Sequence, residues 1–242
     1  MKIIKSENAV ELGVNAAKLT AEKLNEAIAK NGNARIILST GASQFETLSA
    51  LVKEDVDWSK VEMFHLDEYV KLPETHVASF RKYLKERFIN IVHPKNAYLV
   101  DGDHPEEAIK FLTEKINEAP IDVALIGIGE NAHIAFNDPP ANFDTRESYI
   151  IVNLDTKCRM QQVGEGWFAG IDDVPAQAIS MTTYRIMQSK TIISAVPHAV
   201  KANAIKMMME SKETTNMVPA TLLKEHPDYY LFVDKNSAGD TL

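Results

Sequence analysis

The sequence is poor in cysteine and has no long apolar run. Its 242 residues include one cysteine, Cys158, which excludes an intramolecular disulfide framework and a cysteine-rich zinc site. No window approaches the roughly 20 consecutive apolar residues of a membrane-spanning helix. We therefore expect no membrane partner. A chain with one thiol also suits a reducing compartment, so we expect a cytoplasmic protein.

Basic residues are also scarce. The chain has 26 Lys and Arg against 34 Asp and Glu, for a formal net charge of -8. General nucleic-acid binders need a basic excess to neutralise phosphates, so no nucleic-acid partner is expected. A few basic side chains could still gather around one small anionic ligand. No His-x-x-x-His or clustered Cys/His spacing occurs either, so the sequence predicts no metal site.

No Pro/Gly/Ser linker, low-complexity tract or solenoid repeat interrupts the chain. Apolar runs of strand length instead alternate with helical patterns along its length. The pattern predicts one α/β domain over residues 1–242, with a single doubly wound, mostly parallel, Rossmann-like sheet and helices on both faces. The expected strands cover residues 34–39, 61–66, 96–100, 121–129, 149–152, 190–196 and 229–233, and the expected helices cover residues 8–30, 45–51, 80–88, 105–117, 182–188 and 199–211.

The stretch from Ile121 to Pro139 concentrates reactive side chains. An unbroken apolar run ends in Gly127-Ile-Gly129, which is typical of a buried parallel strand that turns sharply out of its sheet. Asn131, His133 and Asp138 follow at the carboxyl edge, where open α/β sheets bind their ligands. The glycine pair lacks the third glycine of a dinucleotide fingerprint, and no nucleotide triphosphate motif occurs. A nucleotide-dependent reaction is therefore disfavoured.

Other expected loops and helix starts should face the same crevice. A turn of small residues between strand and helix can offer backbone N–H groups to a phosphate, although an ordinary βα turn explains it equally well. Asp67 follows the second strand, in a loop or a helix cap. Together these groups predict a site that holds a phosphorylated metabolite by its anion and moves protons at its other end. The candidates for the anion are Thr40, Gly41, Ala42, Ser43, Arg159 and Lys201.

Five segments in the same order resemble a known family. They are Ser39-Thr-Gly-Ala-Ser43, Phe64-His-Leu-Asp-Glu-Tyr69, residues 127–139, Val174-Pro-Ala-Gln-Ala-Ile179 and Lys201-Ala202. The second is similar to Phe-Asn-Met-Asp-Glu-Tyr, and the third to Gly-x-Gly-x-Asp-Gly-His-Ile-Ala-Phe-Asn-Glu-Pro. The chain thus resembles the glucosamine-6-phosphate deaminase/isomerase family, whose wider relatives are 6-phosphogluconolactonase and ribose-5-phosphate isomerase. The His-Ile-Ala-Phe-Asn run favours the deaminase, because the lactonase characteristically has His-Thr-Ala-Ser there.

The resemblance implies an enzyme that converts glucosamine 6-phosphate, or a close epimer, to ketose 6-phosphate and ammonia. The turn from Gly41 to Ser43, with Arg159 and Lys201, would hold the 6-phosphate of this small-molecule partner. His133 would assist ring opening, and Asp67 would move the proton between C2 and C1 through an enediol-type intermediate. No metal or organic cofactor is required. A homo-oligomer is one state that the resemblance allows.

Three residues around His133 differ from the family motif. Asn131 replaces an aspartate and cannot supply negative charge, whereas Asp138 replaces the longer glutamate. Ala132 replaces a glycine and restricts the turn. Two alternatives stay open. One is a sugar-phosphate isomerase or 6-phosphogluconolactonase-like hydrolase acting on a non-amino substrate. The other is a catalytically weak sugar-phosphate-binding protein, against which the retained proton-handling residues argue.

The segment from Cys158 to Phe168 also departs from the family. Gln161, Gln162 and Trp167 are consistent with a rebuilt sugar-recognition wall and equally with ordinary packing on a helix surface.

Overall fold

The computed structural model describes residues 1–242 and confirms an α/β fold built on a parallel sheet. Seven strands pair in the order β1-β10-β9-β6-β2-β3-β5, and every pairing in this sheet is parallel. Their bounds are β1 (Lys2–Ser6), β2 (Ala34–Leu38), β3 (Val61–His65), β5 (Asn96–Tyr98), β6 (Val123–Leu125), β9 (Thr191–Val196) and β10 (Tyr229–Asp234).

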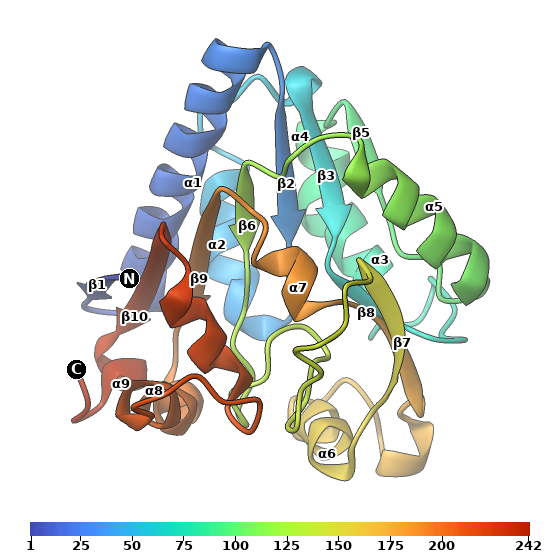
Figure 1. Ribbon diagram of the computed structural model, residues 1–242, viewed down its shortest axis with the longest axis vertical. Coiled ribbons are helices and arrows are strands. Elements are labelled where there is room, and N and C mark those ends of the chain that lie inside the picture. The colour runs from blue at the N-terminus through green and yellow to red at the C-terminus, as the bar shows by residue number, and fades with distance from the viewer.

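Helices cover both faces of the sheet (Figure 1). One face packs against α1 (Ala9–Asn31), α2 (Phe45–Leu51) and α3 (Phe80–Leu84), which continues through a π-helical turn (Lys85–Ile89) into α4 (Asn90–Val92). The other face packs against α5 (Pro105–Asn117), α7 (Thr183–Ile186) and α8 (Ala202–Glu210). The chain also forms α6 (Thr156–Gly164), α9 (Lys235–Ala238) and 3₁₀ turns at Ala42–Gln44, Trp58–Lys60, Ile171–Asp173, Ala199–Lys201 and Pro219–Glu225.

The central strands are apolar throughout because each one contributes to two cores. Successive side chains of a strand point to opposite faces. On β2, Ile37 packs into the core on the α5 side, whereas Ile36 and Leu38 pack into the core on the α1 side. The neighbouring β6 alternates in the same way, with Ala124 between Val123 and Leu125. This double burial produces the continuous apolar runs from which the sequence predicts parallel strands.

A second, antiparallel sheet was not predicted. Its order is β4 (Asp67–Tyr69), β8 (Gln177–Met181) and β7 (Tyr149–Asn153). The expectation of a loop or helix cap at Asp67 was therefore wrong, because three residues of β4 pair with β8. A three-residue strand is too short to show an alternating pattern, so only its partner reveals it.

Further differences from the sequence prediction include a missed strand and two shifted boundaries. The edge strand β1 was missed, since four of its five side chains are exposed or half-exposed and give no buried pattern. The central strand β6 ends at Leu125 rather than at Gly129, because the chain leaves the sheet before the glycine pair. The expected helix over residues 199–211 begins as a 3₁₀ turn and becomes α-helical at Ala202.

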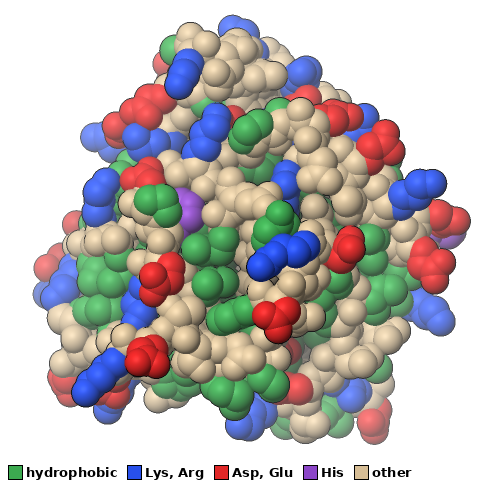
Figure 2. Space-filling model, viewed as in Figure 1, with side chains coloured by type: hydrophobic (Ala, Val, Ile, Leu, Met, Phe, Trp, Pro, Cys, Tyr) green, Lys and Arg blue, Asp and Glu red, His purple; other side chains and the backbone are tan.

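None of the helices combines the length and the apolarity that a bilayer crossing requires. The face seen in Figure 2 carries acidic and basic side chains side by side rather than one basic patch.

Candidate active site

A cavity of about 870 Å³ lies beyond the carboxyl ends of β2, β6 and β9. In Figure 1 the arrowheads of β2, β3 and β6 point towards the end of the molecule where α6 and α8 lie. The walls are residues 39–43 after β2, Asp67 after β3, residues 127–131, 133, 135 and 136 after β6, residues 198, 200 and 201 after β9, and one side of α6. Four strand ends therefore converge on one crevice, as open α/β sheets require.

The small-residue turn lies in this wall, with Thr40, Gly41, Ala42 and Ser43 all lining the cavity. Gly41 has φ 97°, a backbone conformation that glycine adopts without steric cost. The Tyr83 hydroxyl donates a hydrogen bond to the Gly41 carbonyl at 3.0 Å. The turn is thus held in shape from outside the cavity.

We expect Tyr83→Phe to loosen this turn. A lost hydrogen bond is worth about 0.5–1.5 kcal/mol, so binding of a phosphate-bearing ligand should weaken by roughly 2- to 12-fold while turnover changes little. Titration with the ligand and steady-state kinetics would separate the two effects. Tyr98→Phe is the control, because the Tyr98 hydroxyl makes no hydrogen bond and its ring packs against Phe64 and Phe111 instead. Equal weakening in both variants would contradict the role of Tyr83.

Asp67 presents a carboxylate to the cavity from a nearly buried position, with 6% of the residue exposed. No hydrogen bond or ion pair holds this carboxylate. Burial, and secondarily the charge of Glu68, raises the pKa of Asp67 to about 8. A carboxyl group of this kind is poised to accept and return protons near neutral pH.

Its neighbour Glu68 points the other way and has a structural role. It accepts hydrogen bonds from the backbone N–H groups of Phe80 and Arg81 and from the Ser79 hydroxyl, at the start of α3. An acid at a helix N-terminus satisfies N–H groups that have no partner within the helix. The alternation of strand β4 thus divides two adjacent acids between the cavity and the protein interior.

His133 lies over a glycine and in front of an acid. Its Nδ1 is 3.0 Å from Asp138 Oδ1, although the ring N–H is not aligned for a hydrogen bond. Burial alone would raise the pKa of Asp138, but contact with His133 and with the side chains of Asn131 and Cys158 lowers it below its ordinary value. Asp138 is therefore an ionised partner behind the histidine that lines the cavity.

Cys158 completes this group from α6. The thiol is buried, and its Sγ lies within 4.8 Å of a ring nitrogen of His133 and of a carboxylate oxygen of Asp138. Burial raises the pKa of Cys158 far above its ordinary value, so the sulfur stays protonated beside the carboxylate. Nothing in the sequence spacing indicated this cluster.

Asn131 links the histidine to the acid. Its amide nitrogen donates to Asp138 Oδ1 at 3.0 Å, and its amide oxygen accepts from the His133 backbone N–H at 3.2 Å. An amide can donate and accept at the same time, whereas the ionised carboxylate of an aspartate can only accept. The departure from the family motif at Asn131 is thus matched to the shorter acid at 138. Ala132 adopts φ 64°, so the restricted turn is formed despite its Cβ.

We expect Asn131→Asp to lower activity at neutral pH. The new carboxyl group would lie about 3.0 Å from that of Asp138. At this distance two carboxyl groups cannot both ionise without a large electrostatic cost. One acid would take up a proton, and the histidine would lose part of its ordering. The double variant Asn131→Asp/Asp138→Asn restores one donor and one acid and should recover part of the rate. Higher steady-state turnover in the single variant than in the wild type would contradict this account.

Lys201 supplies a buried cation at the cavity wall. Burial lowers its pKa, and the charges of Glu165 and Glu130 partly offset that effect. No acid pairs with the ammonium within 4.0 Å, so its charge is free for an anionic ligand.

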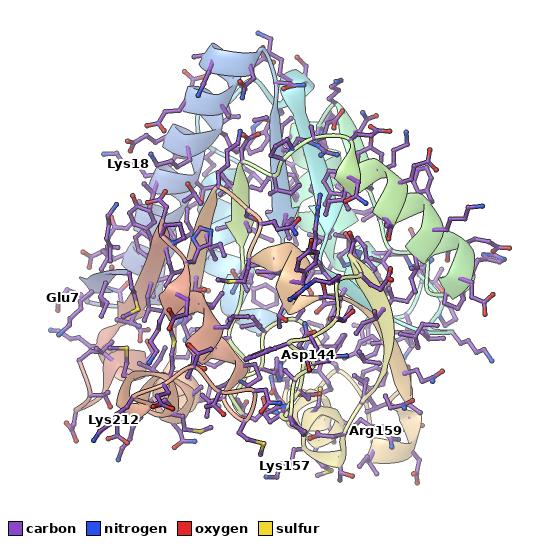
Figure 3. All side chains as sticks on the ribbon, viewed as in Figure 1. Glu7, Lys18, Asp144, Lys157, Arg159 and Lys212 are labelled. Atoms are coloured by element: carbon purple, nitrogen blue, oxygen red, sulfur yellow. The ribbon has the colours of Figure 1, made fainter.

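Arg159 does not line the cavity. Its guanidinium donates to the backbone carbonyl of Val174 at 3.1 Å and also to that of Ile171, on the outer side of α6. The sequence expectation that it would join the phosphate site is therefore not met in this structure. Figure 3 labels Lys157 on the α8 side of α6 and Arg159 on the opposite side.

Helical geometry explains why Lys157, and not Arg159, faces the cavity. Most residues of the α6 segment that line the cavity, at positions 157, 160, 161, 164 and 165, have the i, i+3, i+4, i+7 and i+8 spacing of one helix face, and Gln162 lines the cavity beside them. Position 159 lies on another face, and the sequence analysis did not identify residues 156–164 as a helix. With that helix assigned, Lys157 would have been the better candidate cation.

The cavity thus brings together Asp67, His133, Asn131, Lys201 and the turn at residues 40–43, with Asp138 directly behind the histidine. Sequence reasoning missed several other lining residues. Their signals are weak, since an isolated serine, glutamate or histidine is ordinary on a surface. The missed side chains are Ser39, Lys157, Glu165 and His198.

Comparison with known proteins agrees with this geometry. Residues 7–231 match the family model described as glucosamine-6-phosphate isomerases/6-phosphogluconolactonase. A glucosamine-6-phosphate deaminase of Streptococcus pneumoniae serotype 4 is 34% identical over 236 residues, covering 97% of each chain. A solved structure of a monomeric glucosamine-6-phosphate deaminase superposes with TM-score 0.88 at 27% identity, covering 98% of this chain and 99% of the other.

A 6-phosphogluconolactonase from Shewanella baltica shares the fold, with TM-score 0.79 at 18% identity and 97% coverage of both chains. A family match over most of the chain, a 34% identical relative of full length and a common fold all point to one conclusion. The chain belongs to the glucosamine-6-phosphate isomerase/6-phosphogluconolactonase family.

Proposed function

We propose that this protein is an amino-sugar-phosphate isomerase/deaminase that converts glucosamine 6-phosphate, or a close epimer, to ketose 6-phosphate and ammonia. The observation that carries the proposal is the buried carboxylate of Asp67, which has no partner and shares one cavity with His133 and Lys201. Cations and a backbone turn at one end, with proton-transfer groups at the other, suit an aldose phosphate.

The phosphate would bind to the turn at residues 40–43, to Lys201 and to Lys157 at the cavity mouth. His133 would move a proton from the anomeric hydroxyl to the ring oxygen, which opens the ring. Asp67 would take the proton from C2 and return it at C1, while a second proton passes from the amine nitrogen to the C1 oxygen, which leaves a C1 hydroxyl and a C2 imine. Water would then add to C2, and ammonia would leave. A positioned acid or base contributes roughly 10²–10⁴ in rate.

Three substrates test the proposal in parallel. Purified protein is incubated with glucosamine 6-phosphate, galactosamine 6-phosphate and 6-phosphogluconolactone, with ammonia, ketose phosphate and lactone hydrolysis as readouts. We expect ammonia and ketose phosphate in equal amounts from one of the amino sugars. Lactone hydrolysis without ammonia would overturn the proposal and support the hydrolase alternative. Binding without any turnover would support the sugar-phosphate-binding alternative.

A cytoplasmic location is part of the same proposal, supported by the single buried thiol. A homo-oligomer stays a prediction, and the solved relative at 27% identity is itself a monomeric enzyme.

A further inference from the structure

The carboxylate of Glu165 is fixed in the cavity wall by two neutral donors. Gln161 Nε2 donates to Oε1 at 2.7 Å, and Trp167 Nε1 donates to Oε2 at 3.0 Å. No Lys, Arg or His nitrogen lies within 4.0 Å of this carboxylate, unlike those of the ion-paired acids elsewhere in the chain. The amide and the indole orient the group without neutralising it, so a full negative charge faces the cavity.

Local backbone geometry builds this arrangement. The helix α6 ends at Gly164, and Gly166 follows with φ 81°, in the left-handed region that closes a helix. The Trp167 backbone N–H bonds back to the Gln162 carbonyl at 3.1 Å, which folds the chain over the last helical turn. The indole thereby reaches a residue two positions earlier, and Gln161 reaches the same residue from one turn before.

The charge of Glu165 acts on the space where the ligand would lie. Burial lowers the pKa of Lys201, and the charge of Glu165 partly offsets that effect. Glu165 lines the same cavity as Lys201 and Asp67, so its charge faces the space that a bound ligand would occupy. A phosphate gains nothing from a carboxylate, so the complementary ligand group is a cation.

We propose that Glu165 is the specificity-determining residue that selects a protonated amine on the bound sugar phosphate. The inference rests on the proposed function and adds to it a residue for amine recognition. It also assigns a role to the segment that departs from the family, because Gln161 and Trp167 then hold the recognition group in place. Sugar phosphates without an amine would leave the charge of Glu165 uncompensated and would bind less well.

The test compares two open-chain ligands that differ only in the amine, 2-amino-2-deoxyglucitol 6-phosphate and glucitol 6-phosphate. Calorimetric titration gives the affinity of the wild type and of Glu165→Gln for each. A charge-assisted hydrogen bond is worth about 1.5–3 kcal/mol, so the variant should bind the amino ligand roughly 10- to 100-fold more weakly. Affinity for glucitol 6-phosphate should stay the same or rise. Equal changes for both ligands, or no change for either, would overturn the proposal.

Two further variants sharpen the result. Glu130→Gln is the matched control, because Glu130 also lines the cavity but no hydrogen bond fixes its carboxylate. If Glu130→Gln also weakened binding of the amino ligand alone, the effect would come from the net charge of the cavity and not from Glu165. That result would overturn the proposal. Trp167→Phe removes one donor and should reduce amine selectivity by a smaller factor than Glu165→Gln. Ammonia release by the wild type tests the proposed function separately, since the two-ligand comparison measures amine preference whether or not turnover occurs.

Discussion

Asp67→Asn should abolish turnover while leaving phosphate binding largely intact. The substituted amide keeps the size of the side chain but cannot take the C2 proton, so we expect a loss of roughly 10²–10⁴ in kcat. The candidate phosphate-binding groups lie on other elements, at residues 40–43 and at Lys201. Steady-state ammonia release and titration with glucitol 6-phosphate measure the two properties. Activity within a few-fold of the wild type would show that Asp67 is not the base.

The same variant should be more stable than the wild type at neutral and alkaline pH. The folded-state pKa of Asp67 is about 8, above its ordinary value, so folding favours the protonated form. Its favourable contribution to the free energy of unfolding is full below about pH 4 and is lost as the pH rises to about 8. Above that pH the buried charge costs on the order of a few kcal/mol, which the amide avoids.

Thermal unfolding of both proteins between pH 4 and pH 9 tests this expectation. The stability difference should be small at the acid end and should grow steadily towards alkaline pH, with the variant the more stable. A constant difference across the range would contradict the raised pKa of Asp67. Lower stability of the variant throughout would indicate that the carboxylate is held by interactions that the structure does not contain.

Gly129→Ala should disable the site by displacing His133. A Cβ added at Gly129 would lie 2.5 Å from Cδ2 of the His133 ring and closer still to Cε1 and Nε2. The ring has to move, and a displacement of about 1 Å in a positioned group can cost about 10²-fold in rate. We expect kcat to fall by about this factor, with little change in affinity for glucitol 6-phosphate.

Gly127→Ala is the matched control, two residues earlier in the same loop. Its added Cβ would meet only the side chains of Gln44, with Nε2 at 3.4 Å, and Ser39, with Oγ at 3.8 Å, which are ordinary contacts. This variant should keep most of the activity. A similar loss in both variants would assign the effect to the loop backbone and not to the histidine ring.

The parts of the site that the sequence indicated are those whose chemistry and position reinforce each other. His133 lies in the loop that follows the apolar run of β6, and Asp67 follows the apolar run of β3, two strands away in the sheet, so each strand end carries a reactive group. The resemblance assigned roles to the same residues. The expected role of Arg159 was inferred from its charge alone. The orientation of its side chain depends on α6, which directs it to the Val174 carbonyl and not to the cavity.

Local pattern by itself determined the α/β class, the parallel strands and the segment that carries His133. Burial of a strand on two faces leaves a continuous apolar run, and that signal needs no tertiary partner. Only the tertiary structure decided which residues meet. Strand β4 exists because β8 lies beside it, and the raised pKa of Asp67 arises from burial by distant segments. The position of Glu165 in the cavity wall likewise depends on the turn of α6. These properties depend on contacts between residues far apart in the chain, or on the direction of a helix face, and a local sequence pattern predicts neither.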